Sequence, residues 1–268
     1  MNFISGGMLG DFIHNLSVVK NICEREQSRA NIYLTDKIHM YNGDVWKFGC
    51  KKAHQDLMEM VMLQPFINKF EVLPDDFSES FVNLNSWRME LENDRIRKGF
   101  YYRSWSEILS SHYNYGICQT YKWINVDQVD DEMKGKIAIH RSLHRHNPSF
   151  NWNSILNMNE EFVFITSSIE EWEKFQFKND RIKLKLVESI SDMVLCINSC
   201  KYFIGNQSAP FAIASALDVP RLVELDYSAC VFYMNERKYS KNISWYLRND
   251  INTLKDFYAS IQTIKDKS

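Results

Sequence analysis

The sequence predicts an α/β fold of two Rossmann-like, doubly wound domains that face a central cleft. Short apolar segments alternate with amphipathic helical segments, and this alternation restarts after a polar, acidic stretch over 127–136. Such alternation is typical of parallel sheets built from βαβ units. The 268 residues suffice for two domains of roughly 130 residues each. We therefore expect one domain over 1–133 and a second over 134–268.

Apolar spacing places the elements of the first half. A strand over 2–5 leads through a glycine turn into a helix from Asp11, in which Phe12, Leu16 and Val19 recur at helical spacing. Further strands are expected at 32–34, 70–73 and 81–84, and helices at 55–63 and 105–113. This half thus has the alternation expected of one Rossmann-like domain.

The second half shows the same alternation with more strands. The expected strands are 137–140, 162–165, 182–186, 202–204 and 221–225. The expected helices are 152–158, 169–175, 191–198, 210–217 and a final amphipathic helix over 251–264, which could pack back on the first domain. Strands of this length, buried between helices, predict a second parallel sheet.

Composition excludes several classes of protein. The net charge of −2 gives no basic field to hold a nucleic acid, so nucleic-acid partners are not expected. The longest apolar runs are shorter than the roughly 20 residues of a transmembrane helix, so no transmembrane segment is expected. Six cysteines without a C-x-x-C pair, in a chain without a signal-like start, predict free thiols and a cytoplasmic location.

The stretch from Cys200 to Glu224 is the most informative part of the chain. It predicts a buried strand, a tight polar loop (Gly205 to Ala209), a helix that starts near Pro210, and a second strand. Proline suits the first helical turn because its missing N–H leaves no bond unmade there. The start of a helix at the carboxyl end of a strand is where anionic phosphates bind in open α/β sheets. A capped β-turn-α unit without a ligand is the alternative.

The loop Ser5-Gly6-Gly7-Met8-Leu9-Gly10-Asp11 supports two interpretations. Gly7 and Gly10 match a dinucleotide-binding fingerprint in which Ser5 replaces the first glycine, and Asp36 would be its ribose-binding acid. Alternatively, the loop is a tight strand-to-helix turn that presents Asp11. A carboxylate at a helix start is stabilised as an anion, which suits a general base, although it could equally be a simple N-cap.

A basic stretch, His140-Arg141-Ser142-Leu143-His144-Arg145-His146, follows the strand 137–140. Arg141 and Arg145 can hold phosphate oxygens with their planar, forked guanidinium groups. The three histidines could instead bind zinc, but no cysteine or carboxylate lies near them in sequence. A solvated polar loop is the third interpretation.

An acidic turn, Ser167 to Glu171, follows the strand 162–165. Ser168 and Glu171 fit a capping box, which would be purely structural. The same position could present a carboxylate, such as that of Glu170, to ribose hydroxyls. The chain has no Asp-x-Asp motif and no P-loop, so the charge of a phosphate would be met by arginines and backbone N–H groups.

Three of these segments together resemble the heptosyltransferase-like glycosyltransferases of the glycosyltransferase-B fold. Residues 6–16 are similar to that family's N-terminal G-x-x-G-D-x-[ILV] loop, 137–152 to the opening of its C-terminal domain, and 203–220 to its donor motif. The sequence departs from the donor motif at four positions, where it has Gln207, Ala209, Ala212 and Asp218. Aspartate tolerates the left-handed backbone that glycine supplies there, so we expect the turn at 218 to be retained.

The resemblance implies an enzyme that moves a sugar from a nucleotide-sugar donor to a hydroxyl of a glycan or glycoconjugate acceptor, with inversion and without a metal. The nucleotide-sugar is the substrate, and no cofactor is implied. Domain 1–133 would be the acceptor side and 134–268 the donor side. The implied base is Asp11, and the donor-binding residues expected from motif and resemblance are Gly10, Arg141, Arg145, Glu170, Asn206, Gln207, Ser208 and Ala209. Two alternatives remain, an NAD(P)-dependent oxidoreductase or epimerase and a catalytically inactive nucleotide-sugar-binding module.

Overall fold

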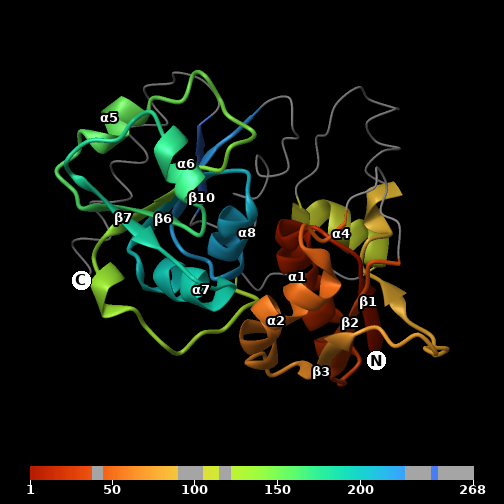
Figure 1. The fold of residues 1–268 in the computed structure, drawn as a ribbon. Coiled ribbons are helices and arrows are strands. Elements are labelled where there is room, and N and C mark those ends of the chain that lie inside the picture. Colours follow the sequence, from red (N-terminus) through yellow and green to blue (C-terminus); the bar gives the residue numbers. More distant parts are fainter. Residues whose placement is uncertain (38–44, 90–104, 115–121, 227–242, 247–268) are drawn as a thin grey trace.

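The computed structural model describes residues 1–37, 45–89, 105–114, 122–226 and 243–246 (Figure 1). The chain forms two parallel sheets, a four-stranded one from the first half and a six-stranded one from the second. Helices pack against both sheets, and no helix in the described ranges is long and apolar enough to span a bilayer. The predicted class, two Rossmann-like α/β domains, is confirmed.

The first sheet has the strand order β3-β2-β1-β4. Its elements are β1 (Asn2–Ser5), α1 (Leu9–Arg25), β2 (Ala30–Leu34), α2 (Gly49–Met62), β3 (Ile67–Val72), β4 (Val82–Asn83) and α4 (Trp105–Tyr113). Each expected strand and helix of this half is present. However, α1 begins two residues before Asp11, and α2 extends back to Gly49, whose φ of 81° suits a residue without a side chain.

The second sheet has the order β10-β9-β8-β5-β6-β7, which is the strand order of the Rossmann fold. Its elements are the 3-10 helix η2 (Asp131–Met133), β5 (Ile137–His140), α5 (Trp152–Leu156), β6 (Phe162–Thr166), α6 (Ile169–Lys174), β7 (Ile182–Leu186), α7 (Ile190–Ser199), β8 (Tyr202–Asn206), α8 (Ala209–Ala216), β9 (Arg221–Glu224) and β10 (Ile243–Tyr246). The sequence did not predict β10, and the expected helix 251–264 lies outside the described residues.

The capping box expected at α6 is wrong. Ser168 occupies the N-cap position without a side-chain hydrogen bond to the helix, and Glu171 instead accepts a hydrogen bond from the Thr166 hydroxyl at 2.5 Å. A complete capping box is found at α7, where the side chains of Ser189 and Asp192 each accept a hydrogen bond from the other residue's backbone N–H.

Alternating side chains of the second sheet enter two different cores. Ile137 and Ile139 of β5 pack with Phe162, Phe164 and other large side chains on one face. Ala138, between them, belongs to the other core, on the face covered by α7 and α8. Because successive side chains of a strand point to opposite faces, the near-continuous apolar runs in the sequence reflect burial on both sides.

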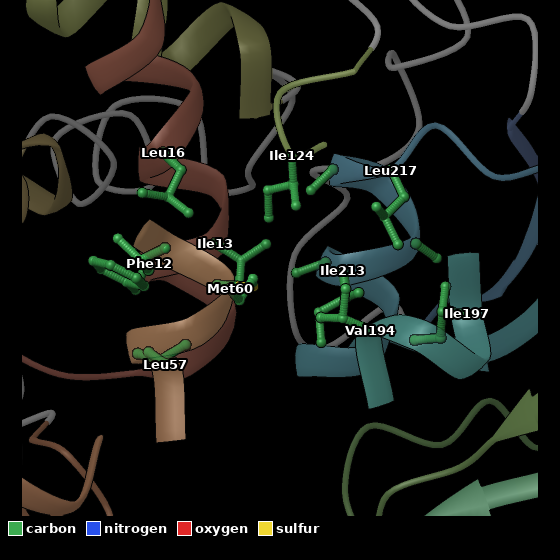
Figure 2. Packing of buried hydrophobic residues seen from close by; sticks show 14 of the residues in the cluster. Phe12, Ile13, Leu16, Leu57, Met60, Ile124, Val194, Ile197, Ile213 and Leu217 are labelled. Carbon is green, nitrogen blue, oxygen red and sulfur yellow. The ribbon is translucent and has the colours of Figure 1, made fainter. Parts of the chain in front are cut away.

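The second of these cores continues across both domains. Helix α1 packs against α8, and α2 packs against α7. Figure 2 shows Ile13 and Met60 from the first domain on one side of this contact and Val194 and Ile213 from the second on the other, all of them buried. The two sheets are therefore joined by one apolar layer of four helices.

The segment that connects the domains is hydrogen-bonded to both of them. The Trp123 indole donates to the Ile13 carbonyl of α1 at 2.7 Å, and the N–H groups of Trp123 and Ile124 donate to the carbonyl of Ala216 at the end of α8. Asn125 exchanges two hydrogen bonds with the side chain of Gln64. This connection supplies partners for a helix C-terminus that would otherwise have an orphan carbonyl.

The cysteines in the described ranges are Cys23, Cys50, Cys196 and Cys200, and they are buried free thiols, as expected. Burial raises the pKa of both Cys196 and Cys200 to about 12, so these thiols are protonated at neutral pH. Cys118 and Cys230 lie outside the described residues.

We predict that the folded protein loses stability in acid because of His14. Its ring stacks on Trp105 with centroids 4.4 Å apart, and burial, with a smaller contribution from Arg221 of the second domain, lowers its pKa from 6.5 to about 3. Between these values the unfolded chain binds a proton that the folded chain does not, so stability falls as pH falls through this window. The penalty reaches about 2–3 kcal/mol near pH 4.5.

His14→Gln should reduce the loss of unfolding free energy between pH 7 and about 4.5, as measured by urea titration at each pH. Burial also lowers the pKa of His140. The same titration of His140→Gln therefore gives the part of the acid-dependent loss of unfolding free energy that is due to this second histidine. An unchanged pH dependence in His14→Gln would show that His14 is protonated without cost in the folded protein.

Candidate active site

The site predicted in the second domain lies at the point in the sheet where the strand order reverses. β5 and β8 are neighbours, and from them the chain continues to β6 on one side and to β9 on the other. In open α/β sheets, ligands bind beyond the carboxyl ends of strands at such a switch point. The two loops that leave this point are 141–147 and 207–208, which contain Arg141, Arg145, Gln207 and Ser208 of the predicted donor-binding set, and Asn206 and Ala209 flank the second loop.

Asn206 fixes the first loop to the second. Its amide oxygen accepts from the Ser142 N–H at 3.1 Å, and its amide nitrogen donates to the Ser142 hydroxyl at 2.9 Å and to the carbonyl of His144. Asn206 is fully buried. A buried amide with both ends paired keeps its geometry, because an unmade bond would cost its desolvation energy. Asn206 therefore holds the backbone of the loop 141–147, called the basic loop below, in one conformation.

Arg145 is the arginine that this loop presents at its surface. It is exposed, its φ is 60°, and its Nη1 donates to the carbonyl of Gln207 at 3.3 Å. The Gln207 side chain is buried and accepts from the N–H of Asp226. The guanidinium of Arg145 consequently lies beside the backbone that leads into α8.

Arg141 has a different environment. It forms a two-pronged ion pair with Glu224, with both nitrogen–oxygen distances at 2.8 Å, and Glu224 is completely buried at the end of β9. The same carboxylate accepts from the Asn147 N–H and the Trp152 indole. The charge of Arg141 is thus matched within the protein, and the pair joins the basic loop to β9 and α5.

The start of α8 has the geometry predicted from the sequence. Ser208 is the N-cap residue, and proline occupies the first turn. The Ser208 hydroxyl donates to the carbonyl of Asn206 at 3.2 Å and makes no capping bond. Because Pro210 has no N–H, the donors at this positive helix end are those of Ser208 and Ala209. Beyond the C-terminal end of α8, Asp218 has a φ of 54°, which confirms the expected left-handed backbone.

The ion pair recorded for Glu170 is not with either of these loops. Glu170 is exposed on α6 and pairs with Lys174 one turn later. The inward-facing acid of this helix is Glu171, whose carboxylate lies 3.9 Å from Nε2 of the buried His140. The described residues contain no group of three or more histidine, cysteine or acidic side chains placed to hold a metal ion.

The first domain brings Asp11 to the same region. In the first sheet the switch point lies between β1 and β4, and Asp11 is in the first turn of α1 beyond β1. The N-cap residue of α1 is Met8, with a φ of 58°, so Asp11 is not the N-cap. Its carboxylate instead forms an ion pair with Arg88, which follows β4. Asp36, the expected ribose ligand of a dinucleotide site, accepts from the Cys50 N–H at the start of α2.

The starts of α1 and α8 are in contact. A Cβ atom added at Gly10 would lie 3.6 Å from the Cα of Ala209 and 3.9 Å from the Cβ of Ala212. Gly10 thus lets two helix N-termini from different domains approach each other. Asp11, one residue after Gly10, and Ser208, one residue before Ala209, consequently belong to helix starts that lie next to each other.

Solved structures with a similar fold include heptosyltransferases and a family 9 glycosyltransferase. The Escherichia coli heptosyltransferase WaaC with ADP-2-deoxy-2-fluoro heptose has a TM-score of 0.56 at 9% identity, over 97% of this chain and 99% of that chain. The E. coli ADP-heptose lps heptosyltransferase II has a TM-score of 0.59 at 13% identity, over 98% and 99%. The family 9 glycosyltransferase of Veillonella parvula has a TM-score of 0.52 at 10% identity, over 96% and 90%.

No family profile and no curated protein sequence matches the chain. At these identities the likeness establishes the fold, which is that of heptosyltransferase-like glycosyltransferases of the glycosyltransferase-B type, as the sequence resemblance predicted. Sequence reasoning did not single out three residues that hold this region: Glu224, Arg88, and Asn85, whose side chain accepts a hydrogen bond from the Gly6 N–H. An acid at the end of a buried strand was the available signal for Glu224, whereas Asn85 and Arg88 lie in a stretch without periodicity.

We predict that the two arginines of the basic loop differ in their effect on stability. Arg141→Ala leaves the buried Glu224 without its charge partner and should cost about 3–5 kcal/mol in unfolding free energy. Arg145→Ala removes an exposed side chain and should change the free energy by less than about 1 kcal/mol. Chemical denaturation of both variants checks this. Equal stabilities would mean that the Arg141–Glu224 pair contributes no net stabilisation.

Proposed function

We propose that the protein is a glycosyltransferase that moves a sugar from a nucleotide-sugar donor to a hydroxyl group of a glycan or glycoconjugate acceptor, with inversion and without a metal. The observation that supports this most is the contact between the starts of α1 and α8, because the first turn of α1 carries Asp11 and the start of α8 is of the kind that binds phosphate in open α/β sheets. The fold shared with the heptosyltransferases is consistent with it.

The donor diphosphate would bind at 206–209 in the second domain. Backbone N–H groups of Ser208 and Ala209 and the guanidinium of Arg145 provide the positive charge that a leaving diphosphate needs. Asn206 and Gln207 hold the loop, and Arg141 fixes its base through Glu224. Because these donors are already fixed, little reorganisation is required when charge develops on the leaving group.

The acceptor would bind on the side of the first domain, where Asp11 removes a proton from the attacking hydroxyl. The carboxylate lies at the positive end of α1 and beside a guanidinium, both of which favour its ionised form. The attack by the hydroxyl oxygen on the anomeric carbon and the departure of the nucleotide diphosphate then occur on opposite faces of the sugar, which inverts its configuration.

The sequence leaves two other functions open. A dinucleotide-dependent oxidoreductase or epimerase would use Asp36 to bind ribose, but its carboxylate already accepts from the start of α2. A catalytically inactive nucleotide-sugar-binding module would keep the donor site and never turn over. Turnover with a bound donor separates that module from the transferase.

Arg145→Ala should weaken nucleotide binding by roughly 10-fold to 100-fold, because a charge-assisted contact contributes about 1.5–3 kcal/mol. A thermal-shift panel of UDP, GDP, ADP, CMP and NAD identifies the nucleotide, since a ligand of the folded state raises the melting temperature. Calorimetry with that nucleotide then compares the dissociation constants of the wild type, Arg145→Ala and a control variant. Arg181→Ala is the matched control, because this exposed arginine lies at the amino end of the edge strand β7, whereas the proposed site lies at the carboxyl ends of β5 and β8. Equal affinities in both variants would place the donor elsewhere.

Asp11→Asn should lower turnover roughly 10²-fold to 10⁴-fold while donor affinity and melting temperature stay close to those of the wild type. Asparagine retains an oxygen that can accept from Arg88 but cannot take up the acceptor proton. Steady-state transfer assays with the nucleotide-sugar found in the panel measure the effect. Full activity in this variant would leave Asp11 with a structural role alone.

A further inference from the structure

Arg88 lies in a helical turn over 87–89, just after the loop at the carboxyl end of β4. Within this loop the Asn83 side chain accepts from the Asn85 N–H at 2.9 Å, and the Ser86 hydroxyl donates to the Asn83 carbonyl at 2.8 Å. Tyr113 of α4 donates to the same carbonyl at 2.8 Å. The backbone that carries Arg88 is thus fixed from within and from a neighbouring helix.

This loop is also joined to the glycine loop after β1. The Gly6 N–H donates to the side chain of Asn85 at 2.6 Å, and this bond is buried. β1 and β4 are neighbours at the switch point of the first sheet, where ligands of such sheets bind. The two loops that flank this point therefore form one unit, with Asp11 on one side and Arg88 on the other.

The guanidinium of Arg88 is held on several sides. Its Nη2 donates to the Asp11 carboxylate and lies 3.3 Å from the Met8 sulfur, and the group sits 5.1 Å from the ring centroid of the buried Trp87. The two charged side chains are only 13% and 14% exposed, so solvent and salt screen their attraction less than that of a surface pair.

We propose that Arg88 is a positioning residue for Asp11, one that keeps the carboxylate ionised and fixes its direction at the start of α1. This role rests on the proposed function of Asp11 as the base. Removal of the guanidinium both takes away a positive charge that favours the carboxylate and frees the side chain to rotate. A pair that served only to hold the loops would change stability without changing the titration of Asp11.

Among the described residues, the groups on the helix of Asp11 and at the facing start of α8 do not supply this charge. On its own helix, His14 is neutral because burial lowers its pKa. The facing start of α8 carries Ser208, Ala209 and Pro210, none of which titrates. In the described part of the chain, the ion pair of Asp11 is with Arg88.

The first test is the pH dependence of kcat and of kcat/KM. In Arg88→Gln, the acid limb of both profiles should move to higher pH by about one unit, as expected for the loss of a neighbouring opposite charge. Arg88→Lys should keep the limb near its wild-type position, and donor KM should not change in either variant. Lys37→Gln is the control, because it removes an exposed charge that pairs with Asp75 in the same domain. An acid limb that stays in place in Arg88→Gln overturns the proposal.

The second test does not depend on turnover. Carbon-13 NMR of aspartate carboxyl groups, with the Asp11 signal identified by its loss in Asp11→Asn, gives the titration midpoint of Asp11 directly. This midpoint should rise by about one pH unit in Arg88→Gln and not in Lys37→Gln. An equal midpoint in wild type and Arg88→Gln rejects the positioning role. If the wild type transfers no sugar, the proposed function fails, and the titration still decides whether Arg88 keeps Asp11 ionised.

Discussion

The packing of α1 against α8 is the constraint on which the rest of this structure depends. The contact contains buried apolar residues of both helices, and at Gly10 the missing side chain lets the start of one helix reach the start of the other. Each burial of a leucine- or isoleucine-sized side chain contributes roughly 1.5–3 kcal/mol. The same packing that stabilises the two-domain fold therefore also places Asp11 beside the start of α8.

The polar groups of the site are fixed by long-range pairs whose partners come from different elements. Asn206 joins β8 to the basic loop, Glu224 joins β9 to that loop and to α5, and Asn85 joins the loops after β4 and β1. Buried pairs of this kind offer little net stability compared with apolar side chains. Their contribution here is geometric, because each holds a loop backbone that carries a proposed functional group.

Much of the fold could be predicted from the sequence, but less of the site. The strands at 137–140 and 182–186 and the helix at 105–113 were placed to the residue, because turn residues or polar segments bound each apolar pattern. β10 was missed because a short edge strand with one polar residue has no clear period. The capping box at Ser168 failed because Thr166 competes for Glu171. The partner of Glu224 lies 83 positions away, and no local pattern reports such a pair.

The shared apolar layer has a consequence for how this chain can change over evolution or be recombined. In many two-domain enzymes, one domain can be exchanged for another with a different ligand preference, because the contact between the domains is small and polar. Here α7 and α8 complete the core of the first domain, and Trp123 and Ile124 bind the end of α8. A chimera that imports a new second domain must therefore also retain the apolar faces of these two helices. Changes of ligand preference are easier to accommodate in the loops beyond the strands than in the helices that form this interface.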